Sequence, residues 1–344
     1  MKAKALRIGK ALSAALFVLL LSVVGMKNAL AQNNVAVLQH GDSISTYYGV
    51  DALKYAIAAA ADEDIITLSS GRFKTCNIRK AITLRGAGCT HDSLTDTYPT
   101  IVIQDGTDNR EIDLSQTTGT LTLEGIWFQY DVYFGTLESP KIVKCNFNCI
   151  RRMNDQKIMN NAQFVNCMIR DFSTYKSVRN IKFYNCVVKG SSGITDETGV
   201  SFVNCIWRES YGLVLPSVLA KNSILWDFSE SNTSLFYNCI GNGNVFNNQQ
   251  NSTNWKVNNI SEVFNSNPNL GEGSDAFYTQ DYTLLESVIN GFPGDDGTQV
   301  SIYGGLAPYN PRPNYMVVRS CNVASQTTND NKLSVDIEVL GVGE

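Results

Sequence analysis

The sequence predicts an all-β protein, a parallel β-helix or solenoid with an N-terminal capping helix and a small C-terminal β-hairpin. Three observations lead to this fold: a repeat in the middle of the chain, one helical segment before it, and an alternating strand pattern near the end. The repeat has a period of about 20 residues, which is typical of solenoids, where each repeat buries its apolar face only against its neighbours.

The repeat is a short phrase, Phe-x-Asn-Cys, that occurs four times. Its cysteines are Cys167, Cys186, Cys205 and Cys239. The first three are 19 residues apart, and the gap of 34 residues before the fourth contains a degenerate copy at Asn222 and Ser223. Two upstream positions, Cys145 and Gly125, are interpreted as earlier members of the same ladder.

The phrase also predicts how the chain bends. Phe and Cys are three residues apart, so the simple alternation of a strand cannot direct both side chains inward. An Asn in the left-handed conformation between them would turn the chain, and Asn tolerates that conformation better than most residues. The residue two after each ladder position is expected to point inward as well: Trp127, Phe147, Ile169, Val188, Trp207 and Leu225. A leucine-rich-repeat solenoid has a similar period, but its leucine-and-asparagine phrase is missing and helices are scarce.

The two ends of the repeat differ from its middle. Residues 51–61 have helical spacing, with Asp51 as a plausible N-cap, and residues 65–68 begin a strand. Five of the eight prolines follow the last clear repeat, so the ladder is expected to stop there. Residues 333–339 alternate between apolar and polar side chains, and residues 315–323 are the expected partner strand of a terminal hairpin.

These features resemble a known group of proteins. The resemblance rests on the helix followed by Ile66-Thr67-Leu68 and Gly71-Arg72-Phe73, on the repeated Asn-Cys pairs, and on the ending Asp296-Gly297-Thr298 with Ile302-Tyr303-Gly304-Gly305. Over residues 40–310 the chain is similar to secreted bacterial proteins of the pectin lyase-like right-handed parallel β-helix superfamily. The resemblance implies a right-handed coil. It leaves the function open, since the superfamily holds polysaccharide lyases, glycoside hydrolases, adhesins and proteins without known activity.

The first 31 residues have the pattern of a signal peptide. Four basic residues between Lys2 and Lys10 precede an apolar run over residues 11–24, and Ala29-Leu30-Ala31 is a small-x-small cleavage site before Gln32. A membrane anchor is the alternative, but the run is too short to span a bilayer. No cysteine follows the cleavage site, so a lipoprotein anchor is not indicated, and no later segment is a transmembrane candidate. We therefore expect a secreted, periplasmic or cell-surface protein with three parts: 1–31 signal peptide, 32–306 β-helix with its N-terminal cap, and 307–344 Pro-rich segment and hairpin.

The charge of the chain is uneven. Residues 1–31 contain five basic residues and no acidic one, so the exported chain would hold 23 Lys and Arg against 32 Asp and Glu, a net charge of −9. Residues 140–245 hold 12 basic and 7 acidic residues, a net charge of +5. A basic middle section on an acidic protein points towards an anionic partner.

The nine cysteines are an odd number, which already prevents complete pairing into disulfides. We interpret those of the ladder as reduced, inward-packing residues, since free Cys packs as a small hydrophobe and Gly and Ser replace it at two ladder positions. Cys145 with Cys149 and Cys76 with Cys89 are the pairs left open, and the redox state of Cys321 is open as well. A zinc site is not predicted, because Cys145-x-x-x-Cys149 has no second half and the two histidines, His40 and His91, are far from it in the sequence.

Signals of catalysis are scarce. The sequence has no G-x-S-x-G, P-loop or H-E-x-x-H motif. Lyases of the resembled superfamily typically use a calcium ion held by clustered acids, with Arg or Lys as base; those signatures are not found, so no catalytic residue is assigned and calcium belongs only to a lyase alternative. Asp171, Glu209 and Asp227 are coil acids that could stack, as glycoside hydrolysis would require, or be solvated surface acids paired with bases. Residues 294–297, Gly-Asp-Asp-Gly, are interpreted as a tight turn rather than a calcium loop.

The most distinctive chemical feature is a column of cations three residues after successive ladder positions: Arg170, Lys189 and Arg208. Alternation predicts that they point outward, about 5 Å apart. An anionic ligand such as a uronate or sulfated glycan would relieve their repulsion. The alternative is an ion-pair ladder with Asp171 and Glu209. Tyr184, also expected to face outward, could stack on a sugar ring.

Three functions remain open from the sequence. The first is a secreted, non-catalytic β-helix that binds glycan or acts as an adhesin-like module at the cell surface, with acidic polysaccharide as partner and no role in nucleic-acid binding. The second is a polysaccharide lyase or glycoside hydrolase acting on acidic polysaccharide. The third is a structural or assembly module that docks through the terminal hairpin. The lack of a recognisable acid–base set favours the first.

Overall fold

The structure is a computed structural model that describes thirteen segments of the chain: residues 34–94, 96–103, 112–115, 119–152, 158–173, 178–192, 199–209, 218–228, 234–242, 245–246, 253–312, 317–323 and 335–340. The expected signal peptide, residues 1–31, lies outside the described residues. Among the described residues, no helix is long and apolar enough to cross a membrane.

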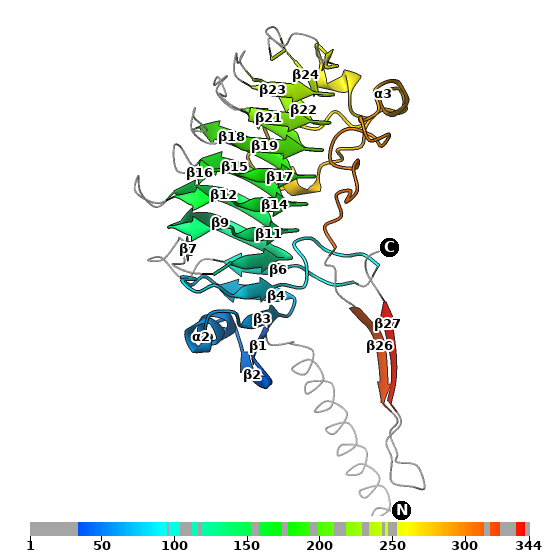
Figure 1. The fold of residues 1–344 in the computed structure, drawn as a ribbon. Coiled ribbons are helices and arrows are strands. Elements are labelled where there is room, and N and C mark those ends of the chain that lie inside the picture. Colours follow the sequence, from blue (N-terminus) through cyan, green and yellow to red (C-terminus); the bar gives the residue numbers. More distant parts are fainter. Residues whose placement is uncertain are drawn as a thin grey trace, which may run out of the picture.

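The main body is a stack of β-coils, which confirms the predicted all-β solenoid (Figure 1). One long sheet, sheet A, runs in the order β2 (Ser43–Tyr48), β1 (Val35–His40), β3 (Ile65–Leu68), β5 (Thr83–Arg85), β8 (Thr122–Glu124), β11 (Lys141–Val143), β14 (Gln163–Val165), β17 (Lys182–Tyr184), β19 (Val200–Val203), β21 (Val218–Lys221) and β23 (Leu235–Tyr237). Its strands pair in parallel, except that β1 is antiparallel to both β2 and β3.

The second long sheet, sheet B, is parallel throughout. Its order is β4 (Gly71–Lys74), β6 (Thr100–Ile103), β9 (Ile126–Phe134), β12 (Asn146–Arg152), β15 (Met168–Ser173), β18 (Val187–Ser192), β20 (Ile206–Glu209), β22 (Ile224–Trp226), β24 (Ile240–Gly241) and β25 (Trp255–Lys256), with β7 (Ile112–Leu114) beside β9. A short third sheet joins β10 (Leu137–Glu138), β13 (Met159–Asn160) and β16 (Val178–Arg179). The right-handed sense of the coil, which the resemblance implies, stays a prediction.

The corner between sheets A and B has the predicted geometry. The Asn before each ladder position is left-handed, with φ between 50° and 54° at Asn166, Asn185, Asn204, Asn222 and Asn238. The ladder cysteines that follow are fully buried: Cys145, Cys167, Cys186, Cys205 and Cys239. The Phe side chains stack from coil to coil, with Phe183 4.9 Å from Phe164 and 5.0 Å from Phe202 between ring centroids.

The upstream end of the ladder differs from the prediction by one residue. Gly125 (φ 66°) occupies the bend, as Lys144 (φ 52°) does in the next coil, and Ile126 takes the cysteine position. Trp127 therefore lies on the outer face of sheet B, against Tyr278, and does not point inward. Glycine adopts the left-handed conformation freely, so Gly125 suits the bend. In the sequence, a small residue before two apolar ones fits the bend and the cysteine position equally well, which explains the shift by one residue.

The cysteines of the described residues are free thiols, as predicted for the ladder: Cys76, Cys89, Cys145, Cys149, Cys167, Cys186, Cys205 and Cys239. Neither of the two bridges left open by the sequence is formed. Burial raises the pKa of the Cys145, Cys167 and Cys186 thiols well above its usual range. These three thiols are therefore protonated and inert at neutral pH. The side chain of Cys321 lies outside the description.

Both ends of the repeat contain the expected elements. Helix α2 (Ala52–Ala59) lies at the N-terminal end of the stack, and its buried side chains belong to the same core as the coils (Figure 1). Asp51 is its N-cap residue but makes no side-chain cap hydrogen bond; its carboxylate lies 3.5 Å from Lys74 Nζ. The C-terminal hairpin is present as β26 (Val317–Val323) antiparallel to β27 (Val335–Leu340).

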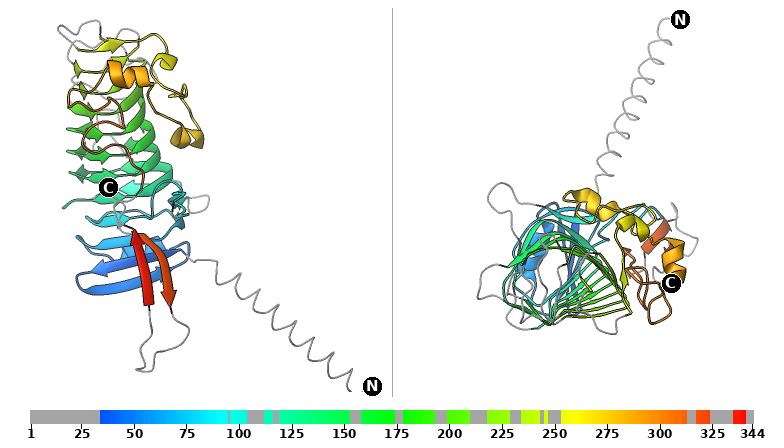
Figure 2. Two further views of the ribbon diagram at one scale, coloured as in Figure 1. Left: turned by 90° about the vertical axis from the view of Figure 1, so that its right-hand side faces the viewer. Right: turned by 90° about the horizontal axis from the view of Figure 1, so that it is seen from above.

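The sequence did not predict that a later part of the chain covers the outer face of sheet B. Residues 257–312, the returning segment, run back along the outside of the stack (Figure 2). The segment holds the short helices η1 (Ile260–Glu262), η2 (Asp275–Thr279) and α3 (Glu286–Gly291). It covers a column of outward apolar residues in sheet B, one after each ladder position: Met168, Val187, Ile206, Ile224 and Ile240. Together they form a second hydrophobic core outside the coil.

The corner asparagines anchor this segment. Asn238 Nδ2 donates to the carbonyl of Pro293 (3.0 Å), and Asn222 Nδ2 to the carboxylate of Asp295 (2.9 Å). Asn185 Nδ2 donates to the carbonyls of Ile302 (2.8 Å) and Gly304 (2.7 Å). Lys144 Nζ donates to the carbonyl of Arg312. The same row that bends the coils therefore ties the returning chain down, from the C-terminal end of the stack towards its N-terminal end.

Candidate functional site

The predicted cation column exists, but it is not an open surface. Arg170 on β15, Lys189 on β18 and Arg208 on β20 lie on the outer face of sheet B, and Lys189 and Arg208 are register partners. All three are half-buried because the returning segment crosses this face. The three side chains point out of the coil, as alternation predicts, but the returning segment covers part of each of them.

Each cation of the column has a partner supplied by the chain. Arg170 Nη1 lies 3.6 Å from Asp275 Oδ1, and Lys189 Nζ donates to the carbonyl of Gly271 at 3.3 Å. Arg208 Nε donates to Asp227 Oδ2 at 2.8 Å. Two of the three partners, Asp275 and Gly271, belong to the returning segment. The column therefore serves in part to hold that segment.

The alternative, in which Asp171 and Glu209 form an ion-pair ladder with the cation column, does not hold, because the cations of the column have other partners. Asp171 lies 4.0 Å from Arg151, and Glu209 is buried. A bulge in β15 after Ile169 adds one residue, so that Asp171 stays on the outer face. Strand β20 keeps its alternation through Trp207 and Arg208 and directs Glu209 inward, beside Gly190. The predicted row of stacked acids is therefore broken at Glu209.

Tyr184 does not join the column. It lies half-buried on the outer face of β17 in sheet A, while the three cations lie on sheet B. The bend at Asn185, to which Ile302 and Gly304 are bound, separates the two surfaces.

One end of the column opens into a hollow of about 260 Å³, which we call the Arg208 hollow. It lies between sheet B and the returning segment. Its wall on the coil side is Arg208 and its register partner Trp226, and its other wall includes Asn258, Asn259 and Asn269. Gly271 lies so close to the Arg208 guanidinium that a Cβ there would clash with it. Trp226 is half-buried, with part of its side chain left accessible.

Local hydrogen bonds fix the asparagine wall. The side chain of Asn259 and that of Glu262 form a capping box at the start of η1. In this box Glu262 Oε1 accepts from the backbone N–H of Asn259 at 2.8 Å, and it also accepts from the N–H of Asn258 at 3.1 Å. Asn269 Oδ1 accepts from the N–H of Gly271 at 3.1 Å. The polar groups of the hollow are therefore held in place without a ligand.

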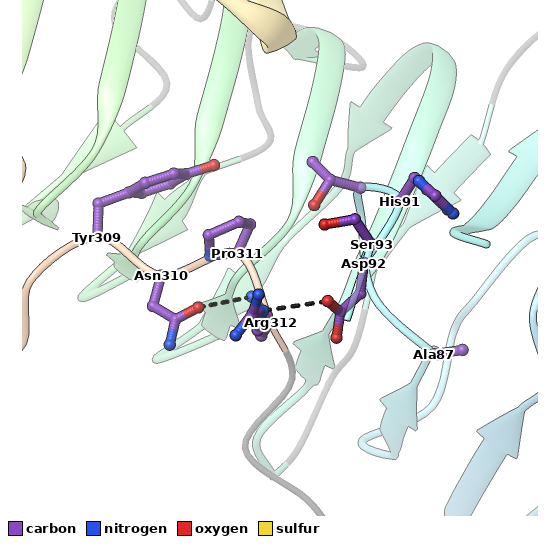
Figure 3. A pocket seen from close by; sticks show the side chains of 9 residues that line it. Ala87, His91, Asp92, Ser93, Tyr309, Asn310, Pro311 and Arg312 are labelled. Carbon is purple, nitrogen blue, oxygen red and sulfur yellow. Dashed lines mark hydrogen bonds and ion pairs between the residues drawn. The ribbon is translucent and has the colours of Figure 1, made fainter. Parts of the chain in front are cut away.

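A second hollow of about 300 Å³, the Arg312 hollow, lies near the other end of the stack (Figure 3). It lies between the loop at Ala87–Ser93 and the end of the returning segment at Tyr309–Arg312. Arg312 Nε is 3.2 Å from Asp92 Oδ1, and its backbone N–H donates to Asn310 Oδ1 at 3.0 Å. His91 Nε2 lies 3.0 Å from Asp96 Oδ1. Arg312 is paired with the carboxylate of Asp92 and the His91 ring with that of Asp96, so this hollow is polar and its arginine already has an acidic partner.

The described residues contain no group of three or more His, Cys, Asp or Glu that could hold a metal ion. The Gly-Asp-Asp-Gly segment is a tight turn, as interpreted from the sequence, with hydrogen bonds from Gly297 N to Gly294 O (3.0 Å) and from Gly294 N to Thr298 O (2.6 Å). Asp295 is 2.6 Å from Lys221 Nζ, and Asp296 accepts from Thr298. The carboxylate of Asp296 therefore stabilises the turn itself, and that of Asp295 holds the turn against the coil.

Sequence reasoning missed the asparagine wall and Trp226. The signal for the returning segment was present, since the residue after each ladder position is apolar in five coils although alternation directs it outward. No local pattern links residues 258–271 to Arg208, because the contact is made across 50 to 63 positions of sequence.

Comparisons of the chain with protein-family models, with curated proteins and with solved structures found no match.

Proposed function

We propose that this protein is an exported, non-catalytic β-helix of the pectin lyase-like type that binds acidic glycan at the cell surface, with the Arg208 hollow as its binding site. The observation that supports the proposal most is the pairing of Arg208 with Trp226 on neighbouring strands, facing a wall of asparagine side chains across a hollow.

Each component suits a charged sugar. The accessible face of an indole packs against the C–H groups of a sugar ring, and amide side chains both donate to and accept from hydroxyl groups. A guanidinium has five N–H donors in a planar fork, and the bond from Nε to Asp227 uses one of them. A carboxylate or sulfate of a glycan is the natural partner of such a fork.

Charge in the neighbourhood supports an anionic ligand over a neutral one. Residues 140–245 have a net charge of +5 within a chain that is acidic elsewhere. Lys189 lies next to Arg208 in the same column and bonds a backbone carbonyl, which does not cancel its charge. Asp227 and Asp275, which are paired with Arg208 and Arg170, lower the positive potential of the column in part. We therefore expect moderate, salt-sensitive binding.

The test is retention on immobilised polysaccharides that are uronate-rich, sulfated or neutral. Wild-type protein should be retained on an acidic member, less so as salt rises, because exposed charges are screened over about 8 Å at physiological ionic strength. Arg208→Gln and Trp226→Ala should each weaken retention roughly tenfold or more, the effect of losing one charge-assisted contact or one aromatic anchor. Arg179→Gln, an exposed cation on the third sheet, is the matched control and should bind as wild type.

The same assay separates the alternatives. If Arg208→Gln and Trp226→Ala bind as well as wild type, or if Arg179→Gln loses as much, the Arg208 hollow is not the site. Unsaturated products that absorb in the ultraviolet, with or without added calcium, would support a lyase instead. A protein retained by no member of the panel would leave the structural or assembly role as the better proposal.

A further inference from the structure

The N-terminal edge of sheet A is an open strand. Among the described strands, β2 pairs only with β1, in unbroken antiparallel register from Ser43 to Tyr48. The strand contains no charged residue, no proline and no bulge. These are the devices by which proteins usually prevent pairing with another chain, so this edge is unprotected.

The outer face next to this edge is apolar and accessible. Ile44 and Tyr48 are 70% and 65% exposed, and Thr46 lies between them on the same side of β2. Their neighbours on β1 are Gln39, Val37 and Val35, which also lack charge. Apolar side chains gathered around an open edge mark an interaction surface.

At the other edge of sheet A, side chains form hydrogen bonds with the backbone groups. At the C-terminal end, Asn254 Nδ2 donates to the carbonyl of Phe236 on β23 (3.0 Å), and Asn254 Oδ1 accepts from the N–H of Cys239 (2.8 Å). Thr253 Oγ1 accepts from the N–H of Asn238 at 2.9 Å. Side chains thus satisfy backbone groups at this end. An association that joins one end to the other in an open filament is therefore disfavoured, whereas one that joins two N-terminal ends is not.

We propose that β2 is the interface of a two-fold dimer, in which it pairs antiparallel with β2 of a second copy of this chain. A register centred on Thr46 places Thr46 opposite the partner's Thr46 and Ile44 opposite the partner's Tyr48, on one face. Such aromatic and β-branched cross-strand pairs stabilise sheets.

The strand matches itself: turned about Thr46, its exposed apolar side chains Ile44 and Tyr48 meet each other, and this two-fold self-complementarity favours a second copy of the chain as the occupant. Residues 32–344 have a net charge of −9, so two copies repel each other over most of their surfaces. The β2 strand and its outer face bring no like charges together, and the one acid that directly precedes the strand, Asp42, would lie opposite the partner's Val50. The edge itself supplies backbone hydrogen bonds that only an extended segment can satisfy.

The proposal is tested by the mass of the purified protein in solution, from sedimentation velocity. Wild type should be a dimer at micromolar concentrations. Thr46→Lys places two ammonium groups directly opposite each other and should weaken the dimer at least tenfold, with the melting temperature of the monomer unchanged because Thr46 is exposed. A wild-type monomer, a filament, or a Thr46→Lys variant that dimerises normally would overturn the proposal.

A cysteine variant tests the register. Residues directly opposite each other in an antiparallel pair have Cα atoms about 4.5–5.5 Å apart, within the range that a disulfide spans. Thr46→Cys should therefore form a disulfide-linked dimer on mild oxidation, above the wild-type background. Thr67→Cys, exposed on β3, would lie roughly five inter-strand spacings from its copy and should not. A dimer in which Thr46→Cys fails to cross-link, or Thr67→Cys cross-links equally, would contradict the pairing.

Discussion

Replacing Phe183 by alanine is expected to lower the free energy of unfolding by about 3–5 kcal/mol, the usual cost of removing a fully buried phenyl group. Phe183 is 0% exposed and stacks between Phe164 and Phe202. It also meets Phe172 and Trp207 edge to face, at 5.4 Å and 5.9 Å between ring centroids. Neighbours on both adjacent coils are thus held by this ring and cannot close the cavity without shifting the stack. Denaturant unfolding followed by circular dichroism measures the change.

The matched control is Tyr237→Ala. Tyr237 follows the Phe of another copy of the same phrase, but it faces solvent and is 49% exposed. Its loss should cost less than about 1 kcal/mol, as surface substitutions usually do. If Phe183→Ala lowered the free energy of unfolding as little as Tyr237→Ala, Phe183 would not be part of a stacked interior of the coils.

Replacing Ile206 by aspartate is expected to cost at least about 3 kcal/mol, because the variant buries a carboxylate without a partner. Ile206 points out of the coil, and on a bare β-helix an acid at this position would be harmless. Here it is 0% exposed, in the second core between sheet B and the returning segment. The variant should melt earlier, and a protease should cleave it faster within residues 257–312.

Leu219→Asp is the control for this substitution. Leu219 also faces outward from a coil strand, but on sheet A, where it is 43% exposed. Its melting temperature should stay close to that of wild type. Equal tolerance of aspartate at residues 206 and 219 would mean that the outer face of sheet B is open.

The interior of the coils was predictable because it repeats. The Phe, Asn and Cys positions recur at a nearly constant spacing, and each residue type has one good place in a coil: Phe and Cys inside, Asn at the left-handed bend. The error at Gly125 arose where the phrase degenerates and a glycine suits the bend better than the ladder. The bulge in β15, which separates the orientations of Asp171 and Glu209, has no signature in the sequence.

The exterior was less predictable because its contacts are long-range. The hydrogen bonds from Asn185 to Ile302 and Gly304 join residues more than 100 positions apart. The column of outward apolar residues on sheet B did carry a signal, since apolar side chains in such a row indicate that another segment covers them. The hairpin of β1 and β2 also had a local signal, since Gly41-Asp42 lies between two short β-prone runs. The Arg208 hollow, by contrast, exists only once the returning segment is in place.

The returning segment covers sheet B and forms one wall of the hollow, and native-state hydrogen exchange of the wild-type protein tests this most directly. The N–H of Ser301 donates to the carbonyl of Asn222 at 2.8 Å, and that of Asp295 to the Asn222 side chain at 3.2 Å. We predict that the amide of Ser301, which is fully buried, exchanges at least about a thousandfold more slowly than an unstructured peptide, as core amides do. Peptides from residues 257–302 should show the same protection wherever the chain contacts sheet B. Exchange of this whole segment at the rate of an unstructured chain, with the coils still protected, would contradict the account.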